Sequence, residues 1–125
     1  MKHVSIIQVL QLHTKMIQAT GGVDGIRDQT LLESALYNAL STFDGKELYP
    51  TIEDKCANIC FSLVKNHPFI DGNKRIGLFI MLILLEYNNV ILRYDQNELV
   101  NLGLGIADGS LNQEYIMNWI KKHKV

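Results

Sequence analysis

The chain has 125 residues, of which 47% are hydrophobic and 20% charged, and its 12 basic and 13 acidic residues nearly cancel. This length and apolar fraction suit a core that needs no disulfide or metal to fold, so we expect a single domain over residues 1–125. The composition excludes disordered, collagen-like and disulfide-scaffold proteins, and a net charge of -1 provides no basic field for nonspecific nucleic-acid binding.

The predicted elements are helices, and we expect an all-α fold. The first covers about residues 5–20 and ends at Gly21-Gly22, where glycine can adopt the left-handed conformation that closes many helices. Phe43 to Pro50 is predicted to be an exposed loop, and Val90 to Tyr94 a short strand. Later helices are predicted to start where a capping side chain precedes an acid or amide by three residues, at Thr30, Thr51, Asp95 and Ser110.

No segment resembles a signal peptide or a membrane span. Met1 to Leu12 contains interleaved polar residues, and the apolar run Ile76 to Leu85 is shorter than the roughly 20 residues that cross a bilayer. The run therefore predicts a buried helix. Cys56 and Cys60 lack the spacing of a zinc site, so we expect two buried free thiols in a reducing, cytoplasmic protein.

Polar residues concentrate in residues 66–75, Asn-His-Pro-Phe-Ile-Asp-Gly-Asn-Lys-Arg, between two apolar helical segments. Pro68 and Gly72 predict a tight turn that ends one helix and opens the next. A helix N-terminus beneath a glycine turn is an anion site. Lys74 and Arg75 are unfavourable near the positive end of a helix dipole unless a polyphosphate lies there, so they also indicate that this turn binds an anion.

Two further residues of this segment suit chemistry on a phosphate. Asp71 is a hard oxygen ligand of the kind that holds Mg²⁺ against phosphate oxygens. His67 can take a proton from an attacking hydroxyl, because histidine has a reference pKa of about 6.5. Each also has a simpler interpretation, since His67 could bond to a carbonyl at a helix end and Asp71 could cap the following helix. Their common spacing favours a functional site.

The stretch from His67 to Arg75 resembles the signature of the Fic family, His-x-Phe-x-(Asp/Glu)-Gly-Asn-(Gly/Lys)-Arg. The lysine at position 74 is typical of the death-on-curing (Doc) branch of the family. The sequence also resembles that branch in its short length and in two segments, Gly25 to Asp28 and Leu31 to Leu36. The resemblance implies a compact helical bundle in which a central buried helix follows the motif loop. It also implies that the loop binds ATP with Mg²⁺.

The resemblance implies a role for each residue of the motif. His67 is expected to be the catalytic general base on the target hydroxyl, Asp71 the magnesium ligand and Phe69 the anchor of the loop in the core. The expected nucleotide-binding residues are Gly72 and Asn73 as the anion cradle, Lys74, and Arg75 on the phosphate oxygens.

Lys74 and Leu78 stand where adenylylating Fic enzymes carry a second glycine and a second arginine. In the Doc branch the nucleotide is taken to lie reversed, so the resemblance implies a protein kinase that transfers the γ-phosphoryl group to a Ser or Thr hydroxyl. The expected target of the kinase is elongation factor Tu, so the resemblance implies that this chain inhibits translation. Alanine occurs in the Doc branch where Gly72 stands, so transfer of AMP remains an alternative, and so does a non-catalytic helical binding module.

The inhibitory helix that many Fic proteins carry, (Ser/Thr)-x-x-x-Glu-(Gly/Asn), has no full copy in this sequence. Ser110 and Glu114 have the spacing of the serine and glutamate in this motif, but Tyr115 stands where the motif has glycine or asparagine. By resemblance to Doc-like toxins, we expect a separate Phd-like antitoxin, whose disordered C-terminal segment folds against this chain. We expect neither direct binding to nucleic acid nor a membrane partner.

Overall fold

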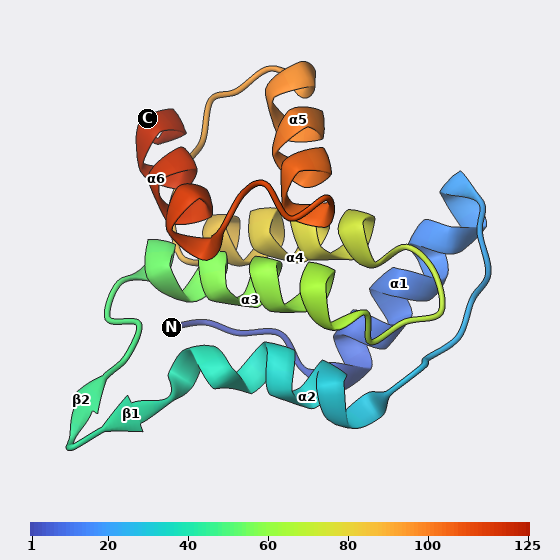
Figure 1. Ribbon diagram of the computed structural model, residues 1–125, viewed down its shortest axis with the longest axis horizontal. Coiled ribbons are helices and arrows are strands. Elements are labelled where there is room, and N and C mark those ends of the chain that lie inside the picture. The colour runs from blue at the N-terminus through green and yellow to red at the C-terminus, as the bar shows by residue number, and fades with distance from the viewer.

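The computed structural model describes all 125 residues, and its regular secondary structure is almost entirely helical (Figure 1). The sole sheet pairs two short antiparallel strands. The all-α class is therefore confirmed. The elements are α1 (Ile6–Thr20), α2 (Gln29–Tyr37), the 3-10 turn η1 (Asn38–Leu40), β1 (Thr42–Phe43), β2 (Lys46–Glu47), α3 (Ile52–Asn66), α4 (Asn73–Tyr87), α5 (Gln96–Ala107) and α6 (Gln113–His123).

Three predicted helix starts are confirmed, because Ser5, Thr51 and Asp95 each accept a hydrogen bond from the N–H three residues on. The other two are wrong. The carboxylate of Asp28 caps α2 by accepting from the N–H of Leu31, which places Thr30 inside the helix. Asn112 caps α6, while the N–H and hydroxyl of Ser110 bond to Asp108 and Gly105 at the end of α5.

The short strands lie in the segment predicted to be a loop. Asp44 and Gly45 have φ angles of 52° and 75°, as the two central residues of a type I′ hairpin turn require. The strand expected at Val90 to Tyr94 does not form, and the segment makes one isolated bridge, between Leu92 and Lys124. The bridge stays isolated because α6 occupies the residues that precede Lys124.

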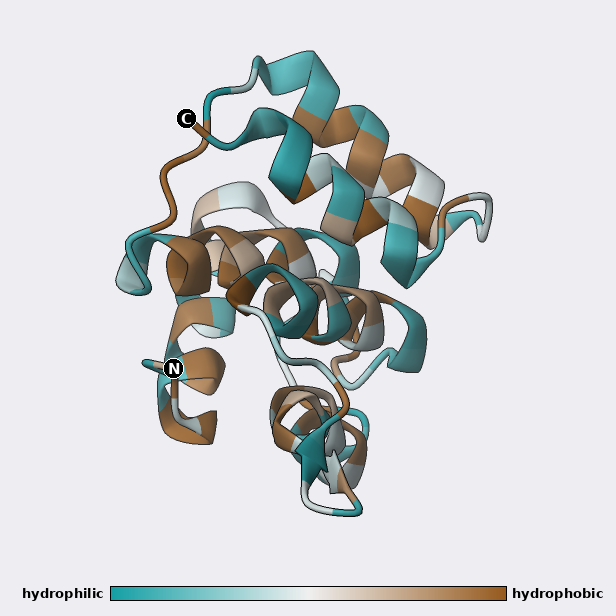
Figure 2. Cartoon of the chain, turned by 90° about the vertical axis from the view of Figure 1, so that its left-hand side faces the viewer, coloured by the Kyte–Doolittle hydropathy of each residue, from teal (hydrophilic) through white to brown (hydrophobic).

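Helix α3 is the most enclosed element, with α2, α4 and α6 packed around it (Figure 1). Hydrophobic and hydrophilic residues are interspersed along most of the helices (Figure 2), as expected for helices that bury one face. The apolar helix α4 approaches α3 closely at Gly77, where a Cβ atom would lie 2.8 Å from the side chain of Val64. Its opposite face is partly open, since Phe79 is 42% exposed. No helix is long and apolar enough to cross a membrane.

Cys56 and Cys60 are buried free thiols, as predicted. Burial raises the pKa of each thiol to about 12, so both stay protonated at neutral pH. No group of three or more His, Cys, Asp or Glu side chains is arranged to hold a metal ion by itself.

Candidate active site

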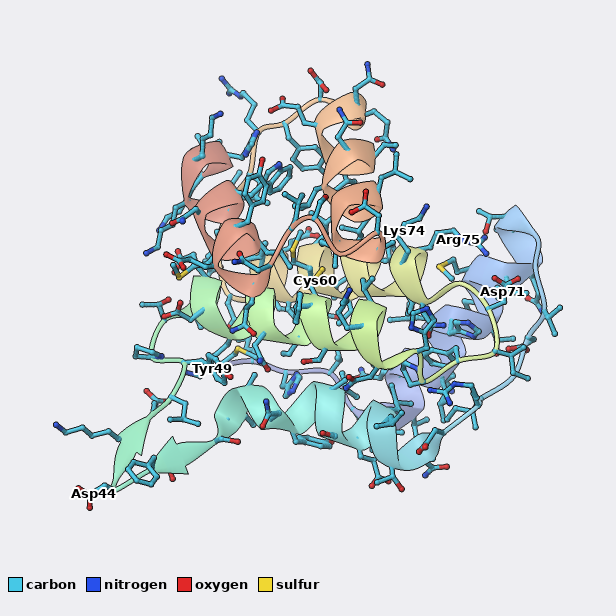
Figure 3. All side chains as sticks on the ribbon, viewed as in Figure 1. Asp44, Tyr49, Cys60, Asp71, Lys74 and Arg75 are labelled. Carbon is cyan, nitrogen blue, oxygen red and sulfur yellow. The ribbon has the colours of Figure 1, made fainter.

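The motif loop, residues 67–72, joins α3 to α4 and lies beside α1 (Figures 1 and 3). His67 closes α3 with a left-handed φ of 51°, and Gly72 opens α4 with a φ of 78°. The turn expected between the two helices is therefore present, and Gly72 supplies the conformation that a side chain would disfavour.

Phe69 and Asn73 hold the loop to the core. Phe69 is 1% exposed, and its ring stacks on that of His13 with centroids 3.7 Å apart. The side-chain oxygen of Asn73 accepts from the N–H of Phe69 at 2.9 Å, and its amide donates to the carbonyl of Phe69 at 3.0 Å. Both polar ends of the Asn73 side chain are therefore occupied, so what it offers to a ligand is its backbone N–H.

His67 presents a basic nitrogen to solvent. Its side chain is exposed, and Nδ1 lies 3.2 Å from the carbonyl oxygen of Lys65. Because a carbonyl only accepts hydrogen bonds, Nδ1 must carry the proton in the neutral ring. The lone pair is then on Nε2, which has no partner in the chain and is free to accept a proton.

Asp71 is an ionised carboxylate fixed at both oxygens. Oδ1 accepts from the N–H of Gly72 at 2.8 Å, and Oδ2 accepts from the N–H of Val23 at 3.1 Å. These bonds, from Val23 first and Gly72 second, lower the pKa of Asp71, and the Arg75 guanidinium 3.9 Å away acts in the same direction. Gly72 itself is the N-cap of α4 and has no side-chain cap, so the carboxylate does not serve as one.

The donor set around Asp71 fits a magnesium ion shared with a nucleotide. Mg²⁺ is usually held by one or two carboxylates together with waters and substrate phosphates, and seldom by a cage made of protein alone. The side chain of Asp71 is 45% exposed and its oxygens retain lone pairs beyond the two hydrogen bonds. A single accessible carboxylate next to an anion site meets that requirement.

The start of α4 offers hydrogen-bond donors and positive charge. The backbone N–H groups of Asn73, Lys74 and Arg75 have no partner within the chain, and the first backbone bond of α4 runs from Ile76 to Gly72. The guanidinium of Arg75 donates to the carbonyl of Gly21 at 3.0 Å and to the hydroxyl of Thr20, which holds it at the end of α1. Free helical N–H groups beside fixed cations are suited to phosphate oxygens.

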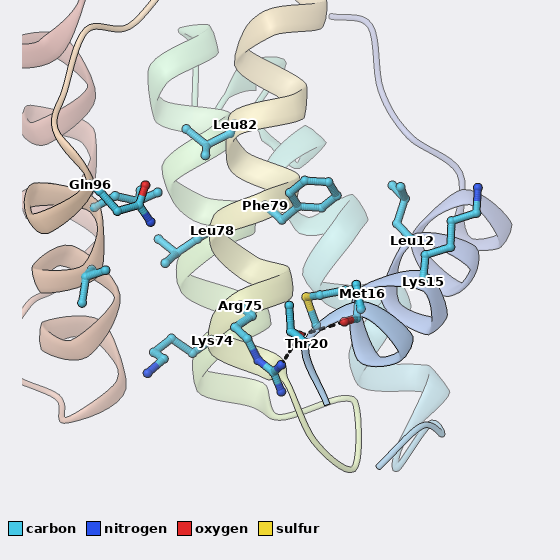
Figure 4. A pocket seen from close by; sticks show the side chains of 13 residues that line it. Leu12, Lys15, Met16, Thr20, Lys74, Arg75, Leu78, Phe79, Leu82 and Gln96 are labelled. Carbon is cyan, nitrogen blue, oxygen red and sulfur yellow. Dashed lines mark hydrogen bonds between the residues drawn. The ribbon is translucent and has the colours of Figure 1, made fainter. Parts of the chain in front are cut away.

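Lys74 lies at the edge of a groove of about 670 Å³ between α1, α4 and α5 (Figure 4). Its ammonium has no ion-pair partner, and a Cβ atom at Gly103 would lie 3.4 Å from its side-chain carbons. Lys15 and Arg75 are the other cations that line the groove. Its apolar lining includes Leu12, Met16, Leu78, Phe79, Leu82, Leu99 and Val100.

The flanking segment, residues 22–28, lies antiparallel to the motif loop, with an isolated bridge between Ile26 and Phe69. Sequence reasoning assigned it no role in the site. A Cβ atom at Gly22 would lie 2.6 Å from Oδ2 of Asp71, so only glycine lets the chain pass so close to the carboxylate. Glycines at 22 and 25 are the signal that indicates such a close approach.

His13 and Arg27 also support the loop and were missed. His13 lies with Val9 and Ile17 on the buried face of α1, and it is 1% exposed. Its Nε2 lies 2.7 Å from the carbonyl oxygen of Asp71, and its Nδ1 lies 3.4 Å from the carboxylate of Asp24. The guanidinium of Arg27 donates to the carbonyls at the end of α3. No local pattern distinguishes these residues, because the carbonyls that they contact in and beside the motif loop are about 40 or more positions away along the chain.

A model of the Fic/DOC family matches residues 3–85 of the chain. Two curated proteins are similar to it. Toxin Doc of Mycolicibacterium smegmatis is 38% identical over 77 residues, which make up 62% of this chain and 59% of that protein. Protein kinase doc of Escherichia phage P1 is 26% identical over 122 residues, 98% of this chain and 95% of that protein. The chain thus aligns with less than two thirds of the first relative and with almost all of the second.

Proposed function

Since the chain belongs to the Fic/Doc family, we propose that it is a Doc-like toxin that transfers the γ-phosphoryl group of ATP to a serine or threonine hydroxyl of a protein. The observation that carries the proposal is the meeting, at one end of α4, of three free backbone N–H groups, an ionised carboxylate and the unpartnered Nε2 of His67. The proposed target, from the resemblance of the motif, is elongation factor Tu, and its modification inhibits translation.

In this proposal His67 is the general base. Its Nε2 takes the proton of the target hydroxyl while the hydroxyl oxygen forms a bond to the γ-phosphorus. The bond from that phosphorus to the oxygen bridging to the β-phosphate breaks, and ADP leaves. The ring needs no change of tautomer for this step, because Nδ1 already donates to the carbonyl of Lys65.

The remaining groups position the nucleotide and offset its charge. Asp71 would hold a magnesium ion, which neutralises charge on the phosphates when it is bound. The free N–H groups and Arg75 bind phosphate oxygens, since phosphoryl transfer depends mainly on positioning and electrostatic stabilisation. Lys74, by resemblance to the Doc branch, favours the reversed nucleotide that exposes the γ-phosphate.

Parallel labelling of a bacterial lysate tests the proposal. The purified chain is incubated with Mg²⁺ and ATP labelled at either the α- or the γ-phosphate, with His67→Ala as control. The variant should fold normally because His67 is exposed. We expect a labelled protein with γ-labelled ATP alone, and none with the variant. Label retained from the α-phosphate would establish AMP transfer instead, and no label together with normal growth on expression would refute both enzymatic functions.

The relative named Toxin Doc supports an antitoxin as the partner, and we propose that the folding segment of the antitoxin occupies the groove beside Lys74. The lining is apolar on three helices and the cations stand at its edge, so an amphipathic helix with an acidic residue fits it. Phe79 is 42% exposed in this groove, whereas Phe43 is 74% exposed on the distant hairpin.

These two phenylalanines give a matched pair of variants. In cells that co-express the antitoxin, Phe79→Asp should restore toxicity because the carboxylate disrupts the apolar contact. Phe43→Asp should remain neutralised by the antitoxin. If the antitoxin neutralises both variants equally well, the groove is not its binding site.

A further inference from the structure

We propose that Arg27 is a positioning residue for His67: its guanidinium fixes the main chain at the end of α3 so that Nε2 of His67 faces the substrate. The inference rests on the proposed function, in which His67 is the base. It adds a residue outside the motif to the apparatus of the reaction.

The contacts of Arg27 are made to consecutive carbonyls. Its Nε donates to the carbonyl of His67 at 2.6 Å, and its Nη2 donates to that of Asn66 at 2.7 Å. The backbone N–H groups of Arg27 and Asp28 both donate to the next carbonyl, that of Pro68, at 2.7 and 3.0 Å. A planar guanidinium with two such bonds fixes orientation as well as distance.

These bonds complete a pattern around the base. The carbonyl of Lys65 accepts from the imidazole Nδ1, those of Asn66 and His67 accept from the guanidinium, and that of Pro68 accepts from the backbone. All four carbonyls from 65 to 68 therefore have donors. Without Arg27, two of them lose their partners, and the peptide planes on either side of His67 are free to rotate.

The conformation of His67 makes this support necessary. Its φ of 51° lies in the left-handed region, which a residue with a Cβ atom adopts only when its surroundings hold it there. Arg27 is exposed, and Asp28 caps α2. The side chain of Arg27 thus serves the end of α3, where its charge also complements the helix dipole.

The test compares Arg27→Ala and Arg27→Lys with Arg93→Ala. Arg93 is an exposed arginine whose side chain makes no hydrogen bond or ion pair, and it lies before α5, away from the motif loop. With γ-labelled ATP, we expect Arg27→Ala to lower kcat by about 10- to 100-fold, the scale expected for a misplaced catalytic group. The KM for ATP should change less than about twofold, because the nucleotide-binding groups lie on α4.

The lysine variant should recover only part of kcat, since one ammonium cannot bridge two carbonyls in a fixed plane. Arg93→Ala should match the wild type. Wild-type kcat in both Arg27 variants would overturn the proposal. If Arg27→Ala fails to fold, the lysine variant alone decides, and wild-type kcat in that variant overturns it.

A second readout does not need activity. Nitrogen-15 NMR of the imidazole distinguishes a ring protonated at Nδ1 from one protonated at Nε2. We expect a dominant Nδ1–H form of His67 above neutral pH, and a shift toward the mixture of free imidazole in Arg27→Ala. A tautomer that depends on Arg27 in a protein that labels nothing would refute the proposed function and keep the positioning role. An unchanged tautomer with unchanged kcat refutes the positioning role alone.

Discussion

Substituting Gly22 with alanine should disturb the proposed magnesium ligand Asp71 while leaving the fold nearly intact, and Gly21→Ala is its matched control. The two glycines are neighbours after α1, and both have positive φ, 119° and 87°. A Cβ atom at Gly21 would meet nothing within 4 Å. At Gly22 it would lie 2.6 Å from Oδ2 of Asp71 and 3.2 Å from Nη2 of Arg75.

The structure gives the size of the two effects. A side chain in these positive-φ conformations, which favour glycine, costs about 1–3 kcal/mol, so both variants should lose about that much stability, or roughly 3–15 °C in Tm. A 2.6 Å contact is about 1 Å shorter than the roughly 3.5 Å at which non-bonded heavy atoms attract best, so the carboxylate must turn away. In turning it gives up the N–H of Val23.

The assay is a magnesium titration of γ-phosphoryl transfer, with thermal unfolding of each variant followed by circular dichroism. For Gly22→Ala we expect a drop in kcat of about 10- to 100-fold, as for a displacement near 1 Å, and a higher Mg²⁺ concentration for half-maximal activity. Gly21→Ala should keep the wild-type titration. If the two variants give the same magnesium dependence, the position of the Asp71 carboxylate does not control the metal, and the reasoning fails.

Two further predictions concern stability. Asn73→Ala leaves the N–H and the carbonyl of Phe69 without partners in the core. It should lower the free energy of unfolding, measured by urea titration, by about 2–4 kcal/mol. Asn118 is exposed, and the control Asn118→Ala should change that free energy by less than about 0.5 kcal/mol. Burial opposes protonation of His123, but hydrogen bonds to Glu98 and to a main-chain carbonyl raise the pKa of His123 overall. The protonated imidazole therefore stabilises the fold fully at pH values below the pKa of histidine in the unfolded chain, near 6.5, and this stabilisation is lost as the pH rises through the pKa in the folded protein. The free energy of unfolding should therefore fall as the pH rises above about 6.5, and Glu98→Gln should flatten that slope; an equal slope in the variant would contradict the assignment.

Local patterns predicted the helices and the motif because their causes are local. Ser5, Thr51 and Asp95 cap helices with bonds that span three residues, and the glycine turn at Gly72 depends on its own φ. Thr30 shows where this reasoning stops. It has the same pattern, but Asp28 is held in an extended conformation by the carbonyl of a residue 40 positions away, and α2 starts there instead.

The supports of the site could not be predicted for the same reason. His13, Gly22 and Arg27 act on the motif loop across separations of about 40 to 58 residues. Before the fold is known, a buried histidine on a helical stripe resembles any core residue, and an arginine in a loop resembles any surface cation. Only the antiparallel placement of the flanking segment against residues 66–70 gives them their partners.

The hairpin tip at Asp44 and Gly45 lies exposed at the far end of the molecule from Asp71 (Figure 3). A break there would put α1, α2 and the flanking segment in one fragment and the whole motif in the other. Neither fragment would then hold the complete candidate site, because the residues that orient the motif loop and the motif itself would be on separate polypeptides. Exposed tips of this kind are where chains tolerate cleavage. Under the proposed function, the same position therefore suits a split form of the protein, in which recovered phosphoryl transfer would report the reassembly of the two halves.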